Sequence, residues 1–347
     1  MYRFKNILLF CLMFLAGNSY AFTIDKLVIF GDSLTDTDGI YAYTNKIHQS
    51  NPIIPAIPAS PPYVDGRFSN GPVWVEYVAK ALHLDPKSPA QFANYAFGGS
   101  WAEPFINSGE VFPFGFDTIM DKYIKDAKDD TQKDKHLYII WMGANDYLSG
   151  RLNAETATDN TVGDIEKEIY RLLNAGARHF LIIDLPDVGI TPEVVAKGPK
   201  FVKEMNTLVQ MHNRKLAAMV ANLRIQRPEA TYIYDEVYAQ MDEIVGHPDK
   251  YNLKNVTQAC YDGGILGVAA RGEKEMQKLH AAGLDIRTNV ALREAYLNGL
   301  STGKFSVCAN QDDYLFWDHV HPTTVGHQLL ANAILDVMKK NDVTGPA

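Results

Sequence analysis

Short apolar runs alternate with amphipathic segments along most of the 347-residue chain, and this alternation restricts the possible folds more than any other feature. The apolar runs predict buried strands at 26–30, 92–97, 136–142, 179–184 and 231–234. Apolar residues at helical spacing predict helices over 72–82, 116–127, 161–175, 200–225 and 323–340. Strands that alternate with helices form a mostly parallel sheet covered on both faces, so the sequence predicts an α/β protein.

Two stretches interrupt the alternation. Five prolines lie between positions 52 and 62, and they predict a loop because proline withholds a backbone donor and restricts the residue before it. The segment from about 239 to 316 has no clear strand–helix order and contains two of the three cysteines. We interpret 22–347 as one domain, with the segment 239–316 as an insertion before the last helix.

The first 21 residues predict a cleavable signal peptide. Arg3 and Lys5 supply positive charge, and the apolar run 7–16 is too short to span a bilayer. Ser19 and Ala21 are small residues at the cleavage-determining positions, so we expect cleavage after Ala21. The remaining chain contains no apolar run long enough for a transmembrane anchor, and we expect a secreted or periplasmic protein.

The charge and the cysteines of the exported chain carry further expectations. The formal net charge of −8 becomes −10 when Arg3 and Lys5 are removed, which disfavours nucleic acid as a partner. Only Cys260 and Cys308 remain after cleavage, and they enclose 47 residues. Export favours a disulfide between them, which contributes about 4 kcal/mol in the chain-entropy model. The alternative is two unrelated buried thiols.

Polar groups and glycines follow three of the predicted strands. Ser33 follows the first strand, Gly99 the second and Asn145 the third. Because the carboxyl ends of parallel strands share one edge of the sheet, we expect these three loops to converge. Ser33 is a candidate nucleophile, while the Gly99 N–H and the Asn145 amide are candidate donors to an oxyanion. The alternatives are helix caps for Ser33 and Asn145 and a tight turn for Gly99.

A serine nucleophile needs a base and a group that orients the base, and one short motif supplies both. Asp318 and His321 lie three residues apart, immediately before the last predicted helix. The competing interpretation is a metal site made from Asp318, His319, His321 and His327. We expect neither a metal nor a cofactor, because no second cluster of such donors is evident.

Four blocks of the chain resemble the GDSL esterase/lipase family, also called SGNH hydrolases. In family order they are Phe30–Leu34, Asn94–Gly99, Gly143–Asp146 and Asp318–His321, and they occur within residues 27–340. The resemblance implies a three-layer α/β/α, flavodoxin-like fold with a parallel central sheet. It also implies Ser33 as nucleophile, His321 as base and Asp318 as its partner. The implied oxyanion hole consists of the Ser33 and Gly99 N–H groups and the Asn145 amide, with the choice between Gly98 and Gly99 left open.

A fifth match narrows the expected substrate. Asp65–Trp74 looks like the corresponding stretch of bacterial secreted lysophospholipases, phospholipases and glycerophospholipid:cholesterol acyltransferases of this family. The resemblance implies hydrolysis of lysophospholipids to release fatty acid, with some acyl transfer to an alcohol or a sterol. The seven aromatic residues from Tyr95 to Phe116 can line an acyl groove or pack in the core.

Other interpretations remain open. The nearest is a GDSL esterase that acts on short-chain, thioester or acetylated-carbohydrate substrates, and the most different is a non-catalytic flavodoxin-like binding module. We also expect the disulfide-closed loop, residues 261–307, to form a lid over the cleft that a protease can nick and thereby activate.

Overall fold

The computed structural model describes residues 22–50, 56–104, 115–148, 153–263 and 306–346. The expected signal peptide, residues 1–21, lies outside the described residues, and so does most of the expected lid, residues 264–305. Within the described part, no helix is both long enough and apolar enough to cross a membrane.

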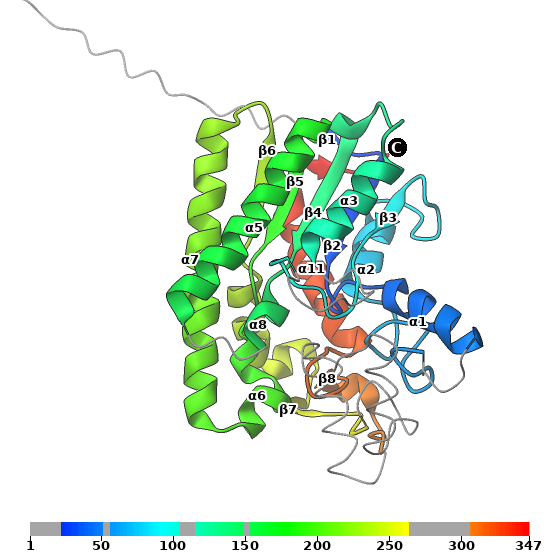
Figure 1. The fold of residues 1–347 in the computed structure, drawn as a ribbon. Helices are drawn as coiled ribbons and strands as arrows, with labels where there is room; N and C mark the ends of the chain where they lie inside the picture. The colour runs from blue at the N-terminus through cyan, green and yellow to red at the C-terminus, as the bar shows by residue number, and fades with distance from the viewer. Residues whose placement is uncertain (1–21, 51–55, 105–114, 149–152, 264–305, 347) are drawn as a thin grey trace, which may run out of the picture.

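A five-stranded parallel sheet forms the centre of the molecule (Figure 1). Its order is β3-β2-β4-β5-β6, and its strands are β2 (Lys26–Gly31), β3 (Phe92–Asn94), β4 (His136–Trp141), β5 (His179–Ile183) and β6 (Thr231–Asp235). Counted along the chain, this order is second-first-third-fourth-fifth, which is the flavodoxin-like arrangement. The strand order reverses between β2 and β4, where the register runs from Lys26 opposite His136 to Gly31 opposite Trp141.

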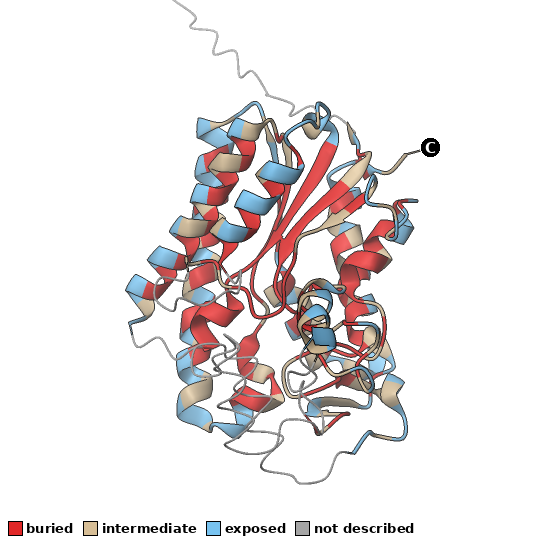
Figure 2. Cartoon of the chain, turned by 45° about the vertical axis from the view of Figure 1, so that its right-hand side comes forward, coloured by how far each residue is buried: buried red, intermediate tan, exposed pale blue. Residues whose placement is uncertain are grey.

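Helices cover both faces of this sheet (Figures 1 and 2). The two faces are formed by α3 (Phe116–Asp126), α5 (Ala154–Ala175) and α7 (Pro199–Gln226) on one side and α2 (Trp74–Ala81), α8 (Val237–Gly246) and α11 (Thr324–Lys340) on the other. Val28 and Phe30 of β2 pack with the first group, whereas Leu27 and Ile29 pack with the second. Successive side chains of a strand point to opposite faces, so one apolar run fills two cores. The predicted three-layer α/β/α fold is therefore confirmed.

Smaller elements complete the fold. They are β1 (Phe22–Thr23), α1 (Gly39–Ser50), η1 (Lys133–Lys135), α4 (Ala144–Leu148), η2 (Val188–Ile190), α6 (Pro192–Ala196), η3 (Pro248–Tyr251), β7 (Asn255–Ala259), η5 (Gln311–Asp313), β8 (Tyr314–Phe316) and β9 (Val343–Thr344). Strand β1 pairs with β9, and β7 pairs with β8, so two short parallel ladders join segments that are distant in sequence.

The boundaries of the predicted elements differ from the structure where side chains cap or turn the backbone. Helix α5 begins at Ala154 instead of 161, because the Asn153 side chain caps it by accepting the Thr156 N–H at 3.1 Å. Strand β3 ends at Asn94 instead of 97, because the Asn94 carboxamide oxygen accepts the Ala96 N–H at 3.0 Å and turns the chain.

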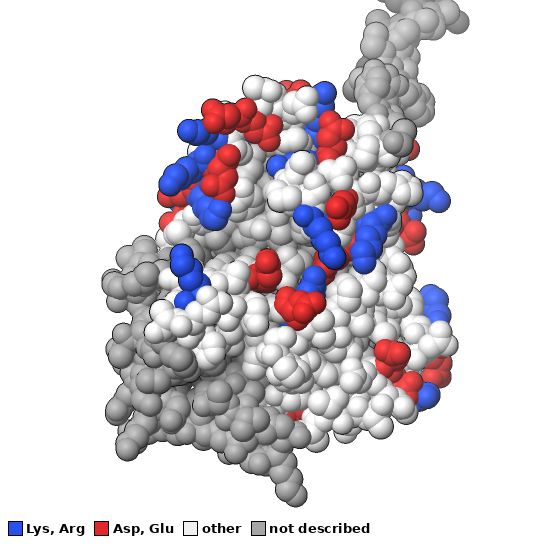
Figure 3. Space-filling model, turned by 90° about the vertical axis from the view of Figure 1, so that its right-hand side faces the viewer, with Lys and Arg blue, Asp and Glu red and all other residues white. Residues whose placement is uncertain are grey.

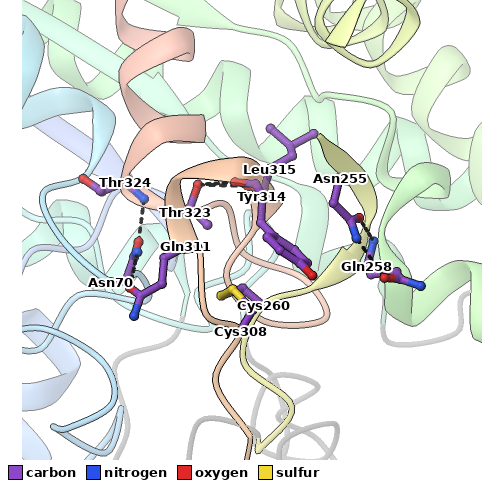
Figure 4. The surroundings of a disulfide bond; sticks show 10 residues. All are labelled: Asn70, Asn255, Gln258, Cys260, Cys308, Gln311, Tyr314, Leu315, Thr323 and Thr324. Atoms are coloured by element: carbon purple, nitrogen blue, oxygen red, sulfur yellow. Dashed lines mark hydrogen bonds between the residues drawn. A yellow bond between two sulfur atoms is a disulfide. The ribbon is translucent and has the colours of Figure 1, made fainter. Parts of the chain in front are cut away.

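The predicted disulfide between Cys260 and Cys308 is present (Figure 4). It joins the end of β7 to the segment before β8, and the Cys308 N–H also donates to the Cys260 carbonyl at 2.8 Å. The start of the segment interpreted as an insertion is built into the core, since Met241 and Ile244 of α8 are buried together with α11.

Candidate active site

Three loops meet at the point where the strand order reverses. The Phe97 N–H after β3 donates to the Gly31 carbonyl of β2 at 3.0 Å. The Asn145 side-chain nitrogen, after β4, lies 3.0 Å from the Ser100 carbonyl and 3.4 Å from an Asp32 carboxylate oxygen. The loops after β2, β3 and β4 therefore converge, as the sequence predicted. Ligands of doubly wound folds bind at this position.

Ser33, His321 and Asp318 form one hydrogen-bonded chain. The Ser33 Oγ lies 2.8 Å from His321 Nε2, and His321 Nδ1 lies 2.8 and 3.0 Å from the two Asp318 carboxylate oxygens. The carboxylate contacts put the imidazole proton on Nδ1, because a carboxylate only accepts, and leave Nε2 to accept the Ser33 hydroxyl proton. All three side chains are buried. The structure thus brings together the three residues that the sequence singled out.

The turn that carries Ser33 is not the start of a helix. The Asp32 carboxylate accepts the Leu34 N–H at 3.0 Å, and the Thr35 and Asp36 N–H groups donate to the Asp32 carbonyl. Helix α1 begins only at Gly39, and the Asp36 carboxylate accepts the N–H groups of Asp38, Gly39 and Ile40 at its start. Asp36, and not Ser33, therefore binds the backbone at the start of α1, so the alternative interpretation of Ser33 as a cap is wrong.

Hydrogen bonds surround the Asp318 carboxylate. Its Oδ1 accepts the Val320 and His321 N–H groups at 2.8 and 2.7 Å, and its Oδ2 accepts the Tyr63 hydroxyl at 2.5 Å. Burial raises the pKa of Asp318, but the His321 imidazole and the hydrogen bonds from His321 and Tyr63 outweigh burial and lower the pKa to about 2. Asp318 is thus ionised at neutral pH in spite of its burial.

The two glycines after β3 have different surroundings. The Gly98 N–H donates to Asp36 Oδ2 at 2.7 Å, and a Cβ at Gly98 would lie 2.5 Å from the Phe68 ring. Gly99 has a φ of 81°, a conformation that favours glycine. Among the described residues, the N–H groups of Gly99 and Ser33 donate to no protein acceptor. The Gly98 N–H is thus already hydrogen-bonded to Asp36, whereas the Gly99 N–H is available to a ligand.

The residues of the metal-site interpretation point to different partners. His319 Nε2 lies 2.8 Å from Asp262 Oδ1, while His321 bridges Ser33 and Asp318. His327 is fully buried on α11, and burial, followed by the effect of His321, lowers its pKa to about 3. Across the described ranges, no group of three or more His, Cys, Asp or Glu side chains could hold a metal ion.

An apolar pocket begins at Ser33. Its polar lining residues are Asp32, Ser33, Asn145, Asp187 and Thr191. Apolar side chains from the loop after β2, β4, α4, η2, α8 and α11 line the rest, including Leu34, Trp141, Leu148, Val188, Met241 and Leu330. Only tertiary packing brings these segments together. Sequence reasoning missed this pocket, because the lining residues look like ordinary core positions of separate helices and strands.

The described aromatic residues between 95 and 116 lie elsewhere. Tyr95 and Phe97 line a different pocket beside β3, and Phe116 packs against Phe30 in the core with ring centres 5.6 Å apart. Phe105, Phe112 and Phe114 lie outside the described residues. Within the described part, none of these aromatics lines the pocket at Ser33.

The block 65–74, which followed the proline-rich loop in the sequence, holds the His321 segment in place. The Arg67 guanidinium binds both carboxylate oxygens of Glu76 at 2.7 and 2.8 Å, which ties the block to α2. Asn70 accepts the Thr324 N–H at 2.7 Å and donates to Gln311 at 2.9 Å (Figure 4). The block therefore bridges the starts of α2 and α11. These contacts hold it close to the site.

Comparison with known proteins agrees with this arrangement. Residues 27–334 match the model of the GDSL-like lipase/acylhydrolase family, which spans most of the chain. The chain belongs to this family. This match confirms the resemblance drawn from the four sequence blocks. The members of the family are acyl hydrolases and esterases.

Individual relatives are moderately similar. A phosphatidylcholine-sterol acyltransferase of Aeromonas hydrophila is 30% identical over 88% of this chain and 88% of its own length. The thermolabile hemolysin of Vibrio parahaemolyticus is 24% identical over 90% of this chain and 63% of its own length. Among solved structures, a lipase/acylhydrolase of Enterococcus faecalis has a TM-score of 0.38 and 14% identity, covering 91% of this chain and 96% of that chain.

Proposed function

We propose that this GDSL family member is an exported serine lipolytic enzyme that releases fatty acid from lysophospholipids and also transfers acyl groups to an alcohol or a sterol. The observation that carries the proposal is the Ser33–His321–Asp318 chain of hydrogen bonds at the mouth of an apolar pocket. A nucleophile, its base and a water-poor binding surface occur together at one place, which is what ester cleavage of a lipid needs.

The proposed reaction follows the positions of the hydrogen bonds. Ser33 Oγ attacks the ester carbonyl carbon while His321 Nε2 takes its proton, and the ionised Asp318 stabilises the resulting imidazolium. His321 then protonates the leaving alcohol, and the acyl group remains on Ser33. A water molecule or an acceptor alcohol next gives its proton to His321 and attacks the acyl carbon. The bond between that carbon and Ser33 Oγ then breaks, and His321 returns the proton to Oγ, which frees Ser33.

The negative oxygen of each tetrahedral intermediate needs donors that are not already engaged. We assign this role to the N–H groups of Ser33 and Gly99 and to the Asn145 amide. The choice of Gly99 over Gly98 is supported by the hydrogen bond that ties the Gly98 N–H to Asp36. Asn145 turns from the Ser100 carbonyl toward the oxyanion in this proposal.

The substrate class is supported by the lining of the pocket. Leu34, Trp141 and Met241 offer apolar surface beside Ser33, in a cavity of about 60 Å³. A cavity of this size supports a site for the carbonyl end of an acyl chain, and each methylene buried there contributes about 0.8 kcal/mol. The similarity to a phosphatidylcholine-sterol acyltransferase supports a phospholipid-type substrate and a sterol acceptor. On the face shown in Figure 3, acidic and basic side chains are interspersed.

Export is part of the proposal. It is supported by the signal-peptide pattern of residues 1–21 and by the disulfide, since disulfides persist in oxidising compartments. Sequencing of the mature N-terminus checks it, and a start at Phe22 is expected. Activation by a protease within 261–307 also remains a proposal, because most of that loop lies outside the described residues.

The deciding experiment measures fatty-acid release from palmitoyl lysophosphatidylcholine by the purified protein and by Ser33→Ala. A butyrate ester of p-nitrophenol serves as the short-chain comparison, and cholesterol is added in a parallel assay to detect a cholesteryl ester. We expect lipid hydrolysis that exceeds short-ester hydrolysis and disappears in Ser33→Ala.

Three results would contradict the proposal in different ways. Serine-dependent activity on the butyrate ester alone would keep the roles of Ser33 and His321 and would favour a short-chain esterase. Activity that persists unchanged in Ser33→Ala would refute the assignment of Ser33 as nucleophile. Absence of all activity, also after mild proteolysis, would favour a different substrate class or the binding-module interpretation.

A further inference from the structure

The Tyr63 hydroxyl donates a hydrogen bond of 2.5 Å to Asp318 Oδ2, and the two residues are 255 positions apart in sequence. It is a buried tyrosine that neither the sequence blocks nor the family resemblance brought to attention. We propose that Tyr63 is a positioning residue of the active site, which fixes the Asp318 carboxylate and thereby His321. This inference rests on the proposed function.

The hydroxyl completes the set of donors around the carboxylate. Oδ1 is held by two backbone N–H groups, those of Val320 and His321, whereas Oδ2 shares the imidazole proton and accepts Tyr63. Without the hydroxyl, Oδ2 keeps only the imidazole contact in the described structure. The carboxylate could then turn about its last bond and move the proton that sets the His321 tautomer.

The packing around Tyr63 aims this hydroxyl. Its ring is 1% exposed and meets Tyr261 and Trp317 edge-on, with ring centres 5.6 and 6.3 Å apart. Tyr261 follows the disulfide-bonded Cys260, and Trp317 precedes Asp318, so two separate segments hold the ring. Burial and the neighbouring Asp318 raise the pKa of Tyr63 well above its ordinary value, so its hydroxyl keeps its proton and remains a donor.

The same loop also covers the imidazole. Phe68 lies over His321 with ring centres 5.0 Å apart, and the Ser69 hydroxyl donates to the Pro322 carbonyl at 2.9 Å. The loop therefore contacts both partners of the Asp318–His321 pair and keeps water away from them. Exclusion of water lowers the local dielectric and so strengthens the electrostatic interaction between Asp318 and His321. Tyr63 is the residue of this loop that donates a hydrogen bond to the Asp318 carboxylate.

The test replaces Tyr63 with phenylalanine, which removes the hydroxyl and keeps the ring. The matched control is Tyr123→Phe. Tyr123 lies on α3 and is equally buried, and this variant also loses a buried hydrogen bond, the one of 2.9 Å between the hydroxyls of Tyr123 and Tyr138. We measure kcat and KM on lysophosphatidylcholine. We also record the downfield proton resonance of the His321 Nδ1–H in protein with isotope-labelled histidine, and melting curves to verify folding.

We expect Tyr63→Phe to lower kcat about tenfold to a hundredfold with little change in KM, because a misaligned base slows the chemical step and not binding. The His321 resonance moves or broadens in this variant, while Tyr123→Phe leaves both readings near those of the wild type. A ring-fluorinated tyrosine at position 63 keeps the hydroxyl as a stronger donor. It should retain turnover and move the resonance in the direction opposite to phenylalanine.

Turnover of Tyr63→Phe within about twofold of the wild type would overturn the proposal, and so would an unchanged His321 resonance. If Tyr63→Phe fails to fold, the fluorinated protein decides alone, and an unshifted resonance there overturns it. Failure of the proposed function gives a different result, since the wild type would then lack Ser33-dependent hydrolysis. The resonance would still report whether Tyr63 fixes the Asp318–His321 pair.

Discussion

At the scale of single residues, the site depends on which donors the fold leaves free. Gly98 and Gly99 are neighbours with the same chemistry, yet the Gly98 N–H is engaged by Asp36 and the Gly99 N–H has no acceptor among the described residues. Burial raises the pKa of Asp36 to about 7, while hydrogen bonds from Ile40, Gly98 and Gly39 act in the opposite direction. Asp36 is thus a structural carboxylate that serves α1 and the loop after β3.

Asn145→Ala tests the amide of the proposed oxyanion hole. We expect kcat on lysophosphatidylcholine to fall by about 10² to 10³, because one preorganised donor to the oxyanion is lost. KM should change little. Asn341→Ala is the control, since it removes an exposed amide at the end of α11 that bonds the Val337 carbonyl. Near-unchanged turnover in folded Asn145→Ala would contradict this role.

At the scale of elements, the pocket at Ser33 is assembled by segments that each have another structural task. The 3-10 helix η2 follows β5 and contributes Val188 and Ile190, whereas α8 contributes Met241. Their apolar side chains continue the core that α2 and α11 form against the sheet. The acyl pocket proposed here is therefore an extension of one hydrophobic core that opens at Ser33.

Ile190→Trp should narrow this pocket from its half-buried rim. We expect the ratio of kcat/KM for palmitoyl lysophosphatidylcholine to that for the butyrate ester to fall about tenfold. Such a loss corresponds to roughly two methylenes that are no longer buried, at about 0.8 kcal/mol each. Ile225→Trp is the control, because Ile225 is exposed on α7 and does not line the pocket. An unchanged ratio in Ile190→Trp would place the acyl chain elsewhere.

At the scale of the whole molecule, two carboxylates at the ends of neighbouring strands are buried together. Burial raises the pKa of Asp184 to about 7 and that of Asp235 to about 6. Asp235 Oδ1 accepts the Gln240 amide, and its Oδ2 has no hydrogen-bond partner in the described part of the chain. The folded protein therefore retains protons on these groups at pH values where the unfolded chain has lost them.

The sign of the resulting pH dependence follows from the raised pKa. Above the ordinary aspartate pKa of 3.8 the unfolded chain binds fewer protons at Asp235 than the folded protein, so stability falls as pH rises toward about 6. We expect Asp235→Asn to remove about 2 kcal/mol of the decline between pH 4.5 and 7.5, measured by urea unfolding at both pH values. Asp129→Asn, at a fully exposed side chain, is the control. Identical declines in wild type and Asp235→Asn would contradict the prediction.

The sequence by itself predicted the strands of the central sheet, most of the covering helices, the fold class and the candidates for the reacting groups. Apolar periodicity located β2, β4 and β5 to within one residue, because buried strands and helices impose their own repeat on the chain. Ser33 was recognisable because it follows the first strand within the block Phe30–Leu34, and the Asp318–His321 pair because its two members are only three residues apart. The disulfide followed from there being two cysteines in a chain expected to be exported.

Only the tertiary structure decided which groups serve those residues. It placed the Asp36 carboxylate on the backbone at the start of α1, engaged the Gly98 N–H and left the Gly99 N–H free among the described residues, and assembled the pocket from segments that are far apart in sequence. Tyr63 and Asp318 are 255 positions apart, and no local pattern links them. The physical reason is that hydrogen-bond partners and cavities depend on distances in space, whereas periodicity and motifs record only the order of residues along the chain.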